Sequence, residues 1–221
     1  MGLFEIHCHT LESSICGKVP ARELVKMHKE AGFEGICLTD HYNDYHFADR
    51  FNDDVMNFLK GYRLAKEYGD EIGLKVLFGV EYRFCDTNND YLVFGITEDF
   101  VIRNPDVYKL TLKEFRNRFQ GEDLIIIQAH PGRDGQKRID VNLLDGMEVV
   151  NGNPRHEARN EQVFKYAKEN NLLMTGASDY HRDTDLFLAC MEFENEINDE
   201  KELVREIKAG RYQIIDNTRF A

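Results

Sequence analysis

The stretch FEIHCHT, residues 4–10, is the most informative segment of this sequence, because two histidines end an apolar, strand-like run. Side chains at positions i and i+2 of a strand point to the same face, so His7 and His9 should project together. The rise of a strand separates them by about 6–7 Å along the backbone. Two imidazoles at this spacing can reach one metal ion, although one such pair is equally typical of solvated histidines at a strand end.

Several further segments are continuous apolar runs, among them ICL (36–38), VLFGV (76–80), LIII (124–127) and LLM (172–174). Strands that are buried on both faces have this pattern, which is typical of a parallel sheet covered by helices. We expect strands over 4–8, 33–41, 74–84, 89–96, 123–130, 146–151, 172–179 and 211–215. We expect helices over 19–32, 53–69, 110–119, 156–171 and 202–210, with Gly69 closing the second of them. Repeated βα units in a chain of 221 residues predict one α/β domain, 1–221, that forms a closed or nearly closed barrel.

Chemistry-bearing side chains gather where these strands end. Of the eight histidines in the chain, only His28 and His46 fall elsewhere. Those at or just after strand ends are His7, His9, His41, His130, His156 and His181, and they are joined by the carboxylates Glu81 and Asp179. Sites in such folds lie at the carboxyl ends of the strands, where these residues would meet.

Imidazole and carboxylate ligands suit Zn²⁺, Mn²⁺ and Fe²⁺. The set is too large for one tetrahedral ion, so we predict two or three divalent metal ions, with Glu81 as a bridge. Clustered cations of this kind activate a water molecule and hold both the attacking and the leaving oxygen. That chemistry hydrolyses phosphoesters and, less specifically, amides.

Composition excludes other classes of protein. A net charge of −12 disfavours binding to nucleic acid, which needs a cationic surface. No apolar run approaches the roughly 20 residues of a membrane span, and the amino terminus lacks the layout of a signal peptide. The five cysteines show no CxxC spacing, as expected of a reducing compartment. We therefore expect a cytoplasmic protein that binds no membrane.

The segments HCHT (7–10), LTDH (38–41), AHPGR (129–133) and SDYH (178–181), with a Glu that closes a strand, resemble the PHP (polymerase and histidinol phosphatase) family. The resemblance implies a distorted (β/α)7 barrel with a trinuclear metal site. It implies that the first metal is held by His7, His9, Glu81 and Asp179. Glu81 would bridge to a second metal held by His130 and His156, the latter eight residues after Glu148. His41 and His181 would hold the third metal.

The chain departs from the family pattern at the remaining ligand of the third metal. Family members usually carry Asp or His a few residues after the HxH motif, often before a glycine, whereas this chain has Cys16 before Gly17. Cys16 can bind as a thiolate because a metal lowers its pKa. The alternatives are that Glu12 reaches in or that the third site is weak.

Three further residues are candidates for supporting roles. Asp40 is either a carboxylate that orients a histidine ligand or the cap of a loop. Arg133 and Arg155 flank histidine ligands, and their guanidinium groups suit phosphate; Lys18 and Arg182 are further candidates for that task.

The sequence thus predicts a metal-dependent phosphoesterase, similar to histidinol phosphatase, that cleaves a small phosphorylated metabolite by attack of a metal-bound hydroxide. Glu81, Asp179, Arg133 and Arg155 are the predicted catalytic residues. The alternatives are a C–N hydrolase of the amidohydrolase type, a nuclease or exonuclease, and a catalytically silent metal-binding domain. The substrate, the native metal and the oligomeric state stay open.

Overall fold

The computed structural model describes residues 1–51, 54–137 and 139–218. Its strands pair in two sheets, one in the order β11-β10-β1-β2-β4 and one in the order β3-β5-β6-β7-β8-β9. The strands of the first sheet are β1 (Gly2–Cys8), β2 (Gly35–Leu38), β4 (Lys75–Phe78), β10 (Ala189–Phe193) and β11 (Tyr212–Asp216). The strands of the second are β3 (His41–Tyr42), β5 (Val80–Tyr82), β6 (Tyr91–Phe94), β7 (Ile125–Gln128), β8 (Gly146–Asn151) and β9 (Leu173–Ala177).

Parallel pairing dominates the parts of both sheets that carry the predicted site. Strand β2 pairs in parallel with β1 and β4, β3 with β5, and β8 with β7 and β9. The predicted α/β fold is therefore confirmed. Antiparallel pairs that the sequence analysis did not predict join β6 to β5 and β7, and β10 to β1 and β11.

Two connections bring the sheets together at the carboxyl ends of their parallel strands. Strand β4 of the first sheet runs through Gly79 directly into β5 of the second. At the other side, Tyr180 follows β9, donates its backbone N–H to His7 O at 2.9 Å and accepts from His9 N at 3.0 Å. This arrangement is compatible with the distorted barrel that the sequence predicts, and it sets the ends of β1 and β9 side by side.

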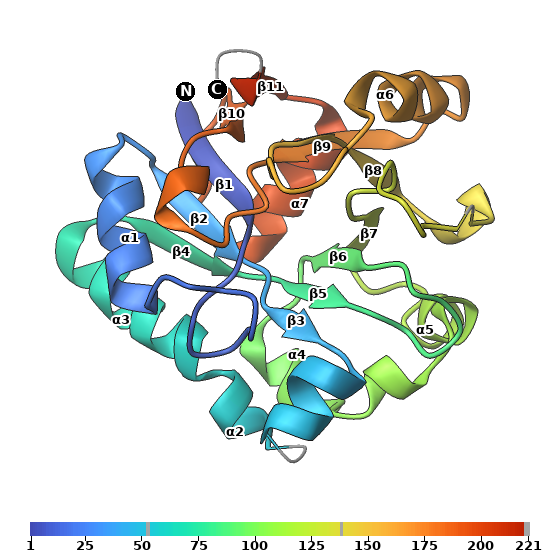
Figure 1. Ribbon diagram of the computed structural model, residues 1–221, viewed down its shortest axis with the longest axis horizontal. Helices are drawn as coiled ribbons and strands as arrows, with labels where there is room; N and C mark the ends of the chain where they lie inside the picture. The colour runs from blue at the N-terminus through green and yellow to red at the C-terminus, as the bar shows by residue number, and fades with distance from the viewer. Residues whose placement is uncertain (52–53, 138, 219–221) are drawn as a thin grey trace.

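Helices cover the outer faces of the sheets (Figure 1). Helices α1 (Ala21–Glu30) and α3 (Lys60–Ile72) lie side by side along β2 and β4. The other helical segments are η1 (Asp44–Asp49), α2 (Val55–Phe58), α4 (Glu98–Arg103), η2 (Val107–Lys109), α5 (Leu112–Arg118), η3 (Val141–Leu143), α6 (Asn160–Glu169), η4 (Asp183–Asp185) and α7 (Glu200–Ala209).

The predicted helix over 53–69 is the one that differs most from the structure. Asp53 lies outside the described residues, and the rest forms two helices, α2 and α3. Gly69 does not end α3, as the sequence analysis expected. A Cβ atom at Gly69 would lie 2.7 Å from Leu74 O, so a glycine there lets the helix approach β4 closely. The helix ends at Gly73, whose φ of 74° is the left-handed conformation that glycine adopts readily.

The buried side chains form three apolar clusters. One lies between the two sheets and includes Phe4, Leu92 and Ile125, with Leu203 of α7 closing it. Burying a large apolar side chain of this kind stabilises the fold by about 1.5–3 kcal/mol. In the described part of the chain, no helix is both long and apolar enough to cross a membrane.

Candidate metal centre

Polar side chains from many strand ends meet in one buried cluster at the junction of the two sheets. His7 lies near the carboxyl end of strand β1, His9 and Cys16 follow β1, His41 begins β3 and Glu81 lies in β5. Asp90 directly precedes β6, and the other members follow β7 and β9. The imidazole centres of His7 and His9 lie 5.1 Å apart, so the two side chains project together as their spacing predicts. The clustered side chains are His7, His9, Cys16, His41, Glu81, Asp90, His130, Asp179 and His181.

Glu81 occupies the middle of the cluster, because the register of β3 and β5 places it directly beside His41. Its side chain is fully buried. Its Oε1 lies 3.0 Å from His130 Nε2, whereas its Oε2 lies 3.3 Å from His7 Nε2. The same Oε2 lies 3.3 Å from His9 Nε2 and 3.0 Å from His41 Nδ1. The two oxygens therefore face different imidazoles, which is the arrangement of a carboxylate that two cations can share.

Asp179 is the second buried carboxylate of the cluster. Its Oδ1 lies 3.3 Å from His7 Nε2 and 3.4 Å from His9 Nε2. The same atom lies 3.3 Å from His181 Nδ1. Its other oxygen, Oδ2, accepts hydrogen bonds from Arg133 and, at 3.1 Å, from Asn153 Nδ2. Oδ1 thus faces the imidazoles, while Oδ2 is fixed by hydrogen bonds from Arg133 and Asn153.

Two members of the cluster have strained backbones. The φ angles of His130 and Asp179 are 33° and 53°, in the left-handed region that residues other than glycine rarely adopt. Such strain costs about 1–3 kcal/mol and concentrates at functional sites. The surrounding sheets hold both residues in a conformation that turns their side chains into the cluster.

The donor atoms of the cluster fit divalent cations. Among the described residues, several buried atoms have no hydrogen-bond partner, namely His7 Nε2, both ring nitrogens of His9, His41 Nδ1, His130 Nδ1 and Glu81 Oε2. Buried polar atoms are normally paired, so this concentration calls for an explanation. Groups of three or four side chains offer donor atoms within 4.8 Å of one another: His9, Cys16, His41 and His181; His7, His9 and Asp179; His7, Glu81 and His130; and His41, Glu81 and Asp90. Imidazole and carboxylate donors suit Zn²⁺, Mn²⁺ and Fe²⁺.

The carboxylates of the cluster stay anionic. Burial favours the neutral acid at Glu81, yet the imidazoles around it, His41 and His7 foremost, hold its pKa well below the usual value. Burial acts in the same direction on Asp179, and there His7 and His181 hold the pKa well below the usual value. Burial lowers the pKa of His7, but Asp179 and Glu148 raise it well above the usual value. A cation that binds here would therefore displace a proton from His7.

Glu148 of β8 orients two of the clustered residues, a role that its sequence position relative to His156 does not reveal. Its Oε1 lies 2.8 Å from His7 Nδ1, and its Oε2 accepts from the backbone N–H of His130 at 2.8 Å. A carboxylate on the far nitrogen of a ligand histidine fixes the tautomer and the ring orientation. The available signal was an acidic residue in the middle of the buried strand GMEVVN (146–151).

Asp40 and Glu12 hold the loop after β1 in place. Asp40 accepts hydrogen bonds from Thr10 N at 2.8 Å and from Ser14 Oγ at 2.7 Å. Of the two roles considered for Asp40, these bonds support that of a loop cap. Glu12 does not reach the cluster. Its Oε2 accepts from Ala21 N at 2.9 Å, at the first residue of α1. Of the two candidates to complete the third metal site, the structure places Cys16 in the cluster and Glu12 outside it.

The two arginines predicted to bind phosphate have different surroundings. Arg133 donates from Nη2 to Asp179 Oδ2 and, at 3.0 Å, to Asn151 Oδ1, and its Nε is buried without a partner among the described residues. Arg155 instead donates from both Nη atoms to the buried carboxylate of Asp185, at 2.7 Å each. The fork of Arg155 is thus engaged outside the cluster. Lys18 and Arg182 are exposed.

The structure does not bring His156 into the cluster. Its side chain is exposed, and it belongs to none of the groups of convergent donor atoms in the described chain. Its role as a metal ligand, which the family resemblance implies, stays a prediction.

Two residues of the cluster's margin escaped the sequence analysis. The ring of His46 in η1 lies 4.3 Å from that of His41, centre to centre, and burial together with His41 lowers the pKa of His46 to about 3. Asp90 stands just before β6 and is bound by Arg83 at 2.8 and 2.7 Å. Because β6 runs antiparallel to β5, its amino end lies at the edge where the parallel strands end. A pattern of parallel strands alone does not place Asp90 at this edge.

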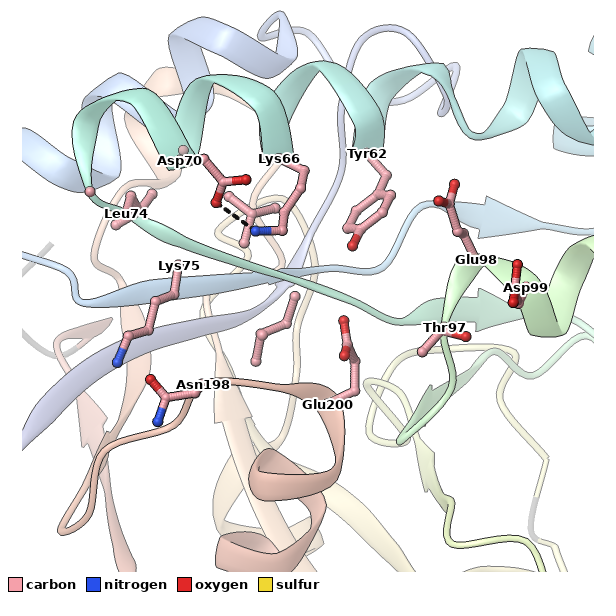
Figure 2. Close-up of a pocket in the computed structure, with 14 residues that line it drawn as sticks. Tyr62, Lys66, Asp70, Leu74, Lys75, Thr97, Glu98, Asp99, Asn198 and Glu200 are labelled. Atoms are coloured by element: carbon pink, nitrogen blue, oxygen red, sulfur yellow. Dashed lines mark hydrogen bonds and ion pairs between the residues drawn. The ribbon is translucent and has the colours of Figure 1, made fainter.

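A separate cavity of about 760 Å³ lies along the outer edge of β4, between α3 and the first turn of α7 (Figure 2). Its walls include Tyr62, Lys66, Glu98 and Glu200, and Lys66 pairs with Asp70 across 2.5 Å. None of the clustered histidines or carboxylates lines it. The cavity therefore lies apart from the candidate metal centre.

Comparisons with known proteins agree with this geometry. A model of the PHP domain matches residues 5–209 of the chain. No match was found among curated protein sequences. The match to the PHP domain and the clusters of histidines and carboxylates together support a metal-dependent hydrolase.

Solved structures with the same fold come from several bacteria. A two-domain protein from Bacteroides vulgatus that contains a predicted PHP-like metal-dependent phosphoesterase has a TM-score of 0.72 and 17% identity, over 97% of this chain and 64% of that one. The chain thus spans less than two thirds of that protein. A proposed metal-dependent phosphoesterase from Bifidobacterium adolescentis has a TM-score of 0.56 and 19% identity, over 93% and 95% of the two chains. An amidohydrolase from Chromobacterium violaceum, with bound sulfate and no metal, has a TM-score of 0.52 and 16% identity, over 95% and 97%.

Proposed function

The chain belongs to the PHP domain family, and from this premise we propose that it is a metal-dependent phosphoesterase that hydrolyses a small phosphorylated metabolite. The observation that carries the proposal is the position of Glu81, whose two carboxylate oxygens face separate imidazoles in a fully buried cluster. Divalent cations held there would polarise a phosphoryl oxygen and lower the pKa of a nucleophilic water. We propose two or three such cations.

The protein's own residues hold and orient the cluster. Glu148 fixes the ring of His7 through Nδ1 and positions the backbone of His130. Asn153 and Arg133 hold the outer oxygen of Asp179, which leaves its inner oxygen directed at the imidazoles. Ligands that are fixed by their neighbours need little reorganisation when charge develops in the transition state.

Arg133 favours a phosphoester over an amide as the substrate. Its side chain is 14% exposed, so it lies at the margin of the cluster, and its Nε has no partner among the described residues. A guanidinium fork matches the several charged oxygens of a phosphoryl group, whereas hydrolysis of an amide develops charge on one oxygen. The net charge of −12 disfavours an oligonucleotide substrate.

The test is a panel of phosphomonoesters, oligonucleotides and amides, assayed with the protein loaded with Mn²⁺ or Zn²⁺. We expect phosphomonoesters to have the highest kcat/KM, and the activity to disappear with a chelator and return with the metal. Faster turnover of an amide would contradict the phosphoesterase and support the C–N hydrolase. Faster turnover of an oligonucleotide would support the nuclease.

A further inference from the structure

Three side chains at one side of the centre bring together a thiol and two imidazoles. Cys16 comes from the loop after β1, His41 from β3, and His181 from the segment after β9. Together with His9, they offer one donor atom each within 4.8 Å of one another. His9 also faces Asp179 and Glu81, so it belongs equally to the carboxylate-rich part of the centre.

The loop that carries Cys16 is held rigidly. Asp40 binds Thr10 and Ser14 on one side, and Lys18 N donates to His181 O at 2.8 Å on the other. A Cβ atom at position 17 would lie 2.5 Å from Thr10 O, so only a glycine permits this close turn. The thiol is therefore directed at the two imidazoles by the fold of the loop.

The imidazoles around this thiol have buried ring nitrogens without hydrogen-bond partners among the described residues. These atoms are both ring nitrogens of His9 and His41 Nδ1, which also faces Glu81 Oε2 at 3.0 Å. His181 is held through Nδ1, which lies 2.8 Å from Asp179 O, and this leaves Nε2 for another ligand. These atoms are independent evidence that the group around Cys16 is built to bind an ion.

We propose that Cys16, His41 and His181 form a zinc-selective position, distinct from the carboxylate-bridged position around Glu81, so that the centre binds different metals at its two sides. The inference rests on the proposed function only in that the centre binds divalent cations. A thiolate is a soft ligand that favours Zn²⁺ over Mn²⁺, whereas carboxylate oxygens suit Mn²⁺. Three protein ligands with an open fourth position are typical of zinc at catalytic sites.

The test measures whether a metal protects Cys16 from alkylation. The protein is stripped with a chelator, reloaded with Zn²⁺ or Mn²⁺, treated with iodoacetamide, and the modified cysteines are identified by mass spectrometry. Cys85 is exposed and serves as the internal control, while Cys8, Cys37 and Cys190 are buried. Without metal, Cys16 should react, because its side chain is partly exposed.

With Zn²⁺ at ten times its dissociation constant, alkylation of Cys16 should slow about tenfold, because only the unbound fraction reacts. Alkylation of Cys85 should not change, and Mn²⁺ at the same concentration should leave Cys16 reactive. Equal rates at Cys16 with and without Zn²⁺ would overturn the proposal, and equal protection by Mn²⁺ would overturn its selectivity. Protection without hydrolysis of any phosphoester would refute the proposed function alone.

A second readout does not depend on alkylation. Loading with Co²⁺ should produce a thiolate-to-metal charge-transfer absorption that the Cys16→Ser variant lacks and the Cys85→Ser variant keeps. An identical spectrum in all three proteins would contradict the thiolate ligand. The alkylation test uses only the wild-type protein. It can therefore still refute the proposal if a variant folds poorly.

Discussion

Glu81 and Asp185 are both fully buried carboxylates near the carboxyl ends of the strands, but their surroundings differ in kind. Asp185 receives two hydrogen bonds from Arg155 at 2.7 Å, and its Oδ2 accepts from His181 N at 2.9 Å. Glu81 faces imidazoles, and its Oε2 has no hydrogen-bond partner among the described residues. A buried charge with all its hydrogen bonds made is costly to disrupt, whereas a buried charge beside polar atoms without partners marks a place for a ligand. Burial alone does not distinguish Glu81 from Asp185. The difference is whether the carboxylate oxygens have hydrogen-bond partners.

The largest expected effect follows from removing the charge of Glu81. Glu81→Gln keeps the shape of the side chain but removes the anion between the imidazoles. Loss of residues that only orient a metal ligand costs about 10–100-fold, so loss of a shared ligand should lower kcat/KM by roughly a hundredfold or more. The metal-free variant should unfold at a lower temperature than the parent, because it loses a charge that His41 and His7 stabilise in the folded state. Parental turnover with full metal content would show that Glu81 is not the shared carboxylate.

Arg133, which binds Asp179 of the cluster, and Arg155, which binds Asp185 outside it, should respond differently to substitution. Arg133→Ala should lower kcat/KM on the best phosphoester about tenfold to a hundredfold at full metal content, because one charge-assisted contact contributes about 1.5–3 kcal/mol. Arg155→Ala should change kcat/KM less and lower the Tm instead, because its fork binds Asp185. Steady-state kinetics and thermal unfolding of both variants separate the roles. The assignment fails if Arg155→Ala loses as much activity as Arg133→Ala while its Tm stays unchanged.

The charge of Asp185 should matter for stability. Asp185→Asn breaks the fork with Arg155 and weakens the bonds from two backbone N–H groups, so the free energy of unfolding should fall by about 1–3 kcal/mol. Asp183→Asn, on the exposed side of the same turn, is the matched control and should leave the free energy unchanged. Denaturant unfolding of the metal-free proteins measures both. An unchanged free energy in Asp185→Asn would remove the contrast with Glu81.

Glu148→Gln should give the smallest effect, because the amide keeps an acceptor for His130 N and loses only the charge beside His7. We expect metal affinity to fall about tenfold. Competition with a chromogenic chelator measures the dissociation constant. Glu192→Gln, on β10 and outside the cluster, is the control. A dissociation constant equal to that of the control would mean that Glu148 does not act through His7.

The sequence predicted the part of the centre that follows from strand ends. His7, His9, His41, Glu81, His130, Asp179 and His181 stand at the ends of apolar runs, and parallel strands bring such ends to one edge. Asp90 could not be placed this way, because it begins a strand that runs antiparallel to β5. Strand β10 (Ala189–Phe193) was not expected, although its sequence ACMEF is largely apolar. Gly69 was taken for the end of a helix because its close packing against β4 is a tertiary contact.

The roles of Arg133 and Arg155 also depend on tertiary contacts that the sequence pattern does not show. Arg133 lies three residues after His130 and Arg155 directly precedes His156, so proximity in the sequence led to the same prediction for both. Their partners, Asp179 and Asp185, lie 46 and 30 residues away, and the fold alone assigns each arginine to one of them. Side chains that act through a distant partner are the part of a site that local patterns predict least well.

The most direct test of the central claim is the metal content of the protein. Elemental analysis of protein purified without chelator, and again after reconstitution with Mn²⁺, Zn²⁺ and Fe²⁺, gives the number of metals per chain. If Glu81 lies between cation positions, the parent protein should hold at least two metals per chain, and Glu81→Gln should hold fewer. A content of one or less in the fully reconstituted parent would contradict a polynuclear centre.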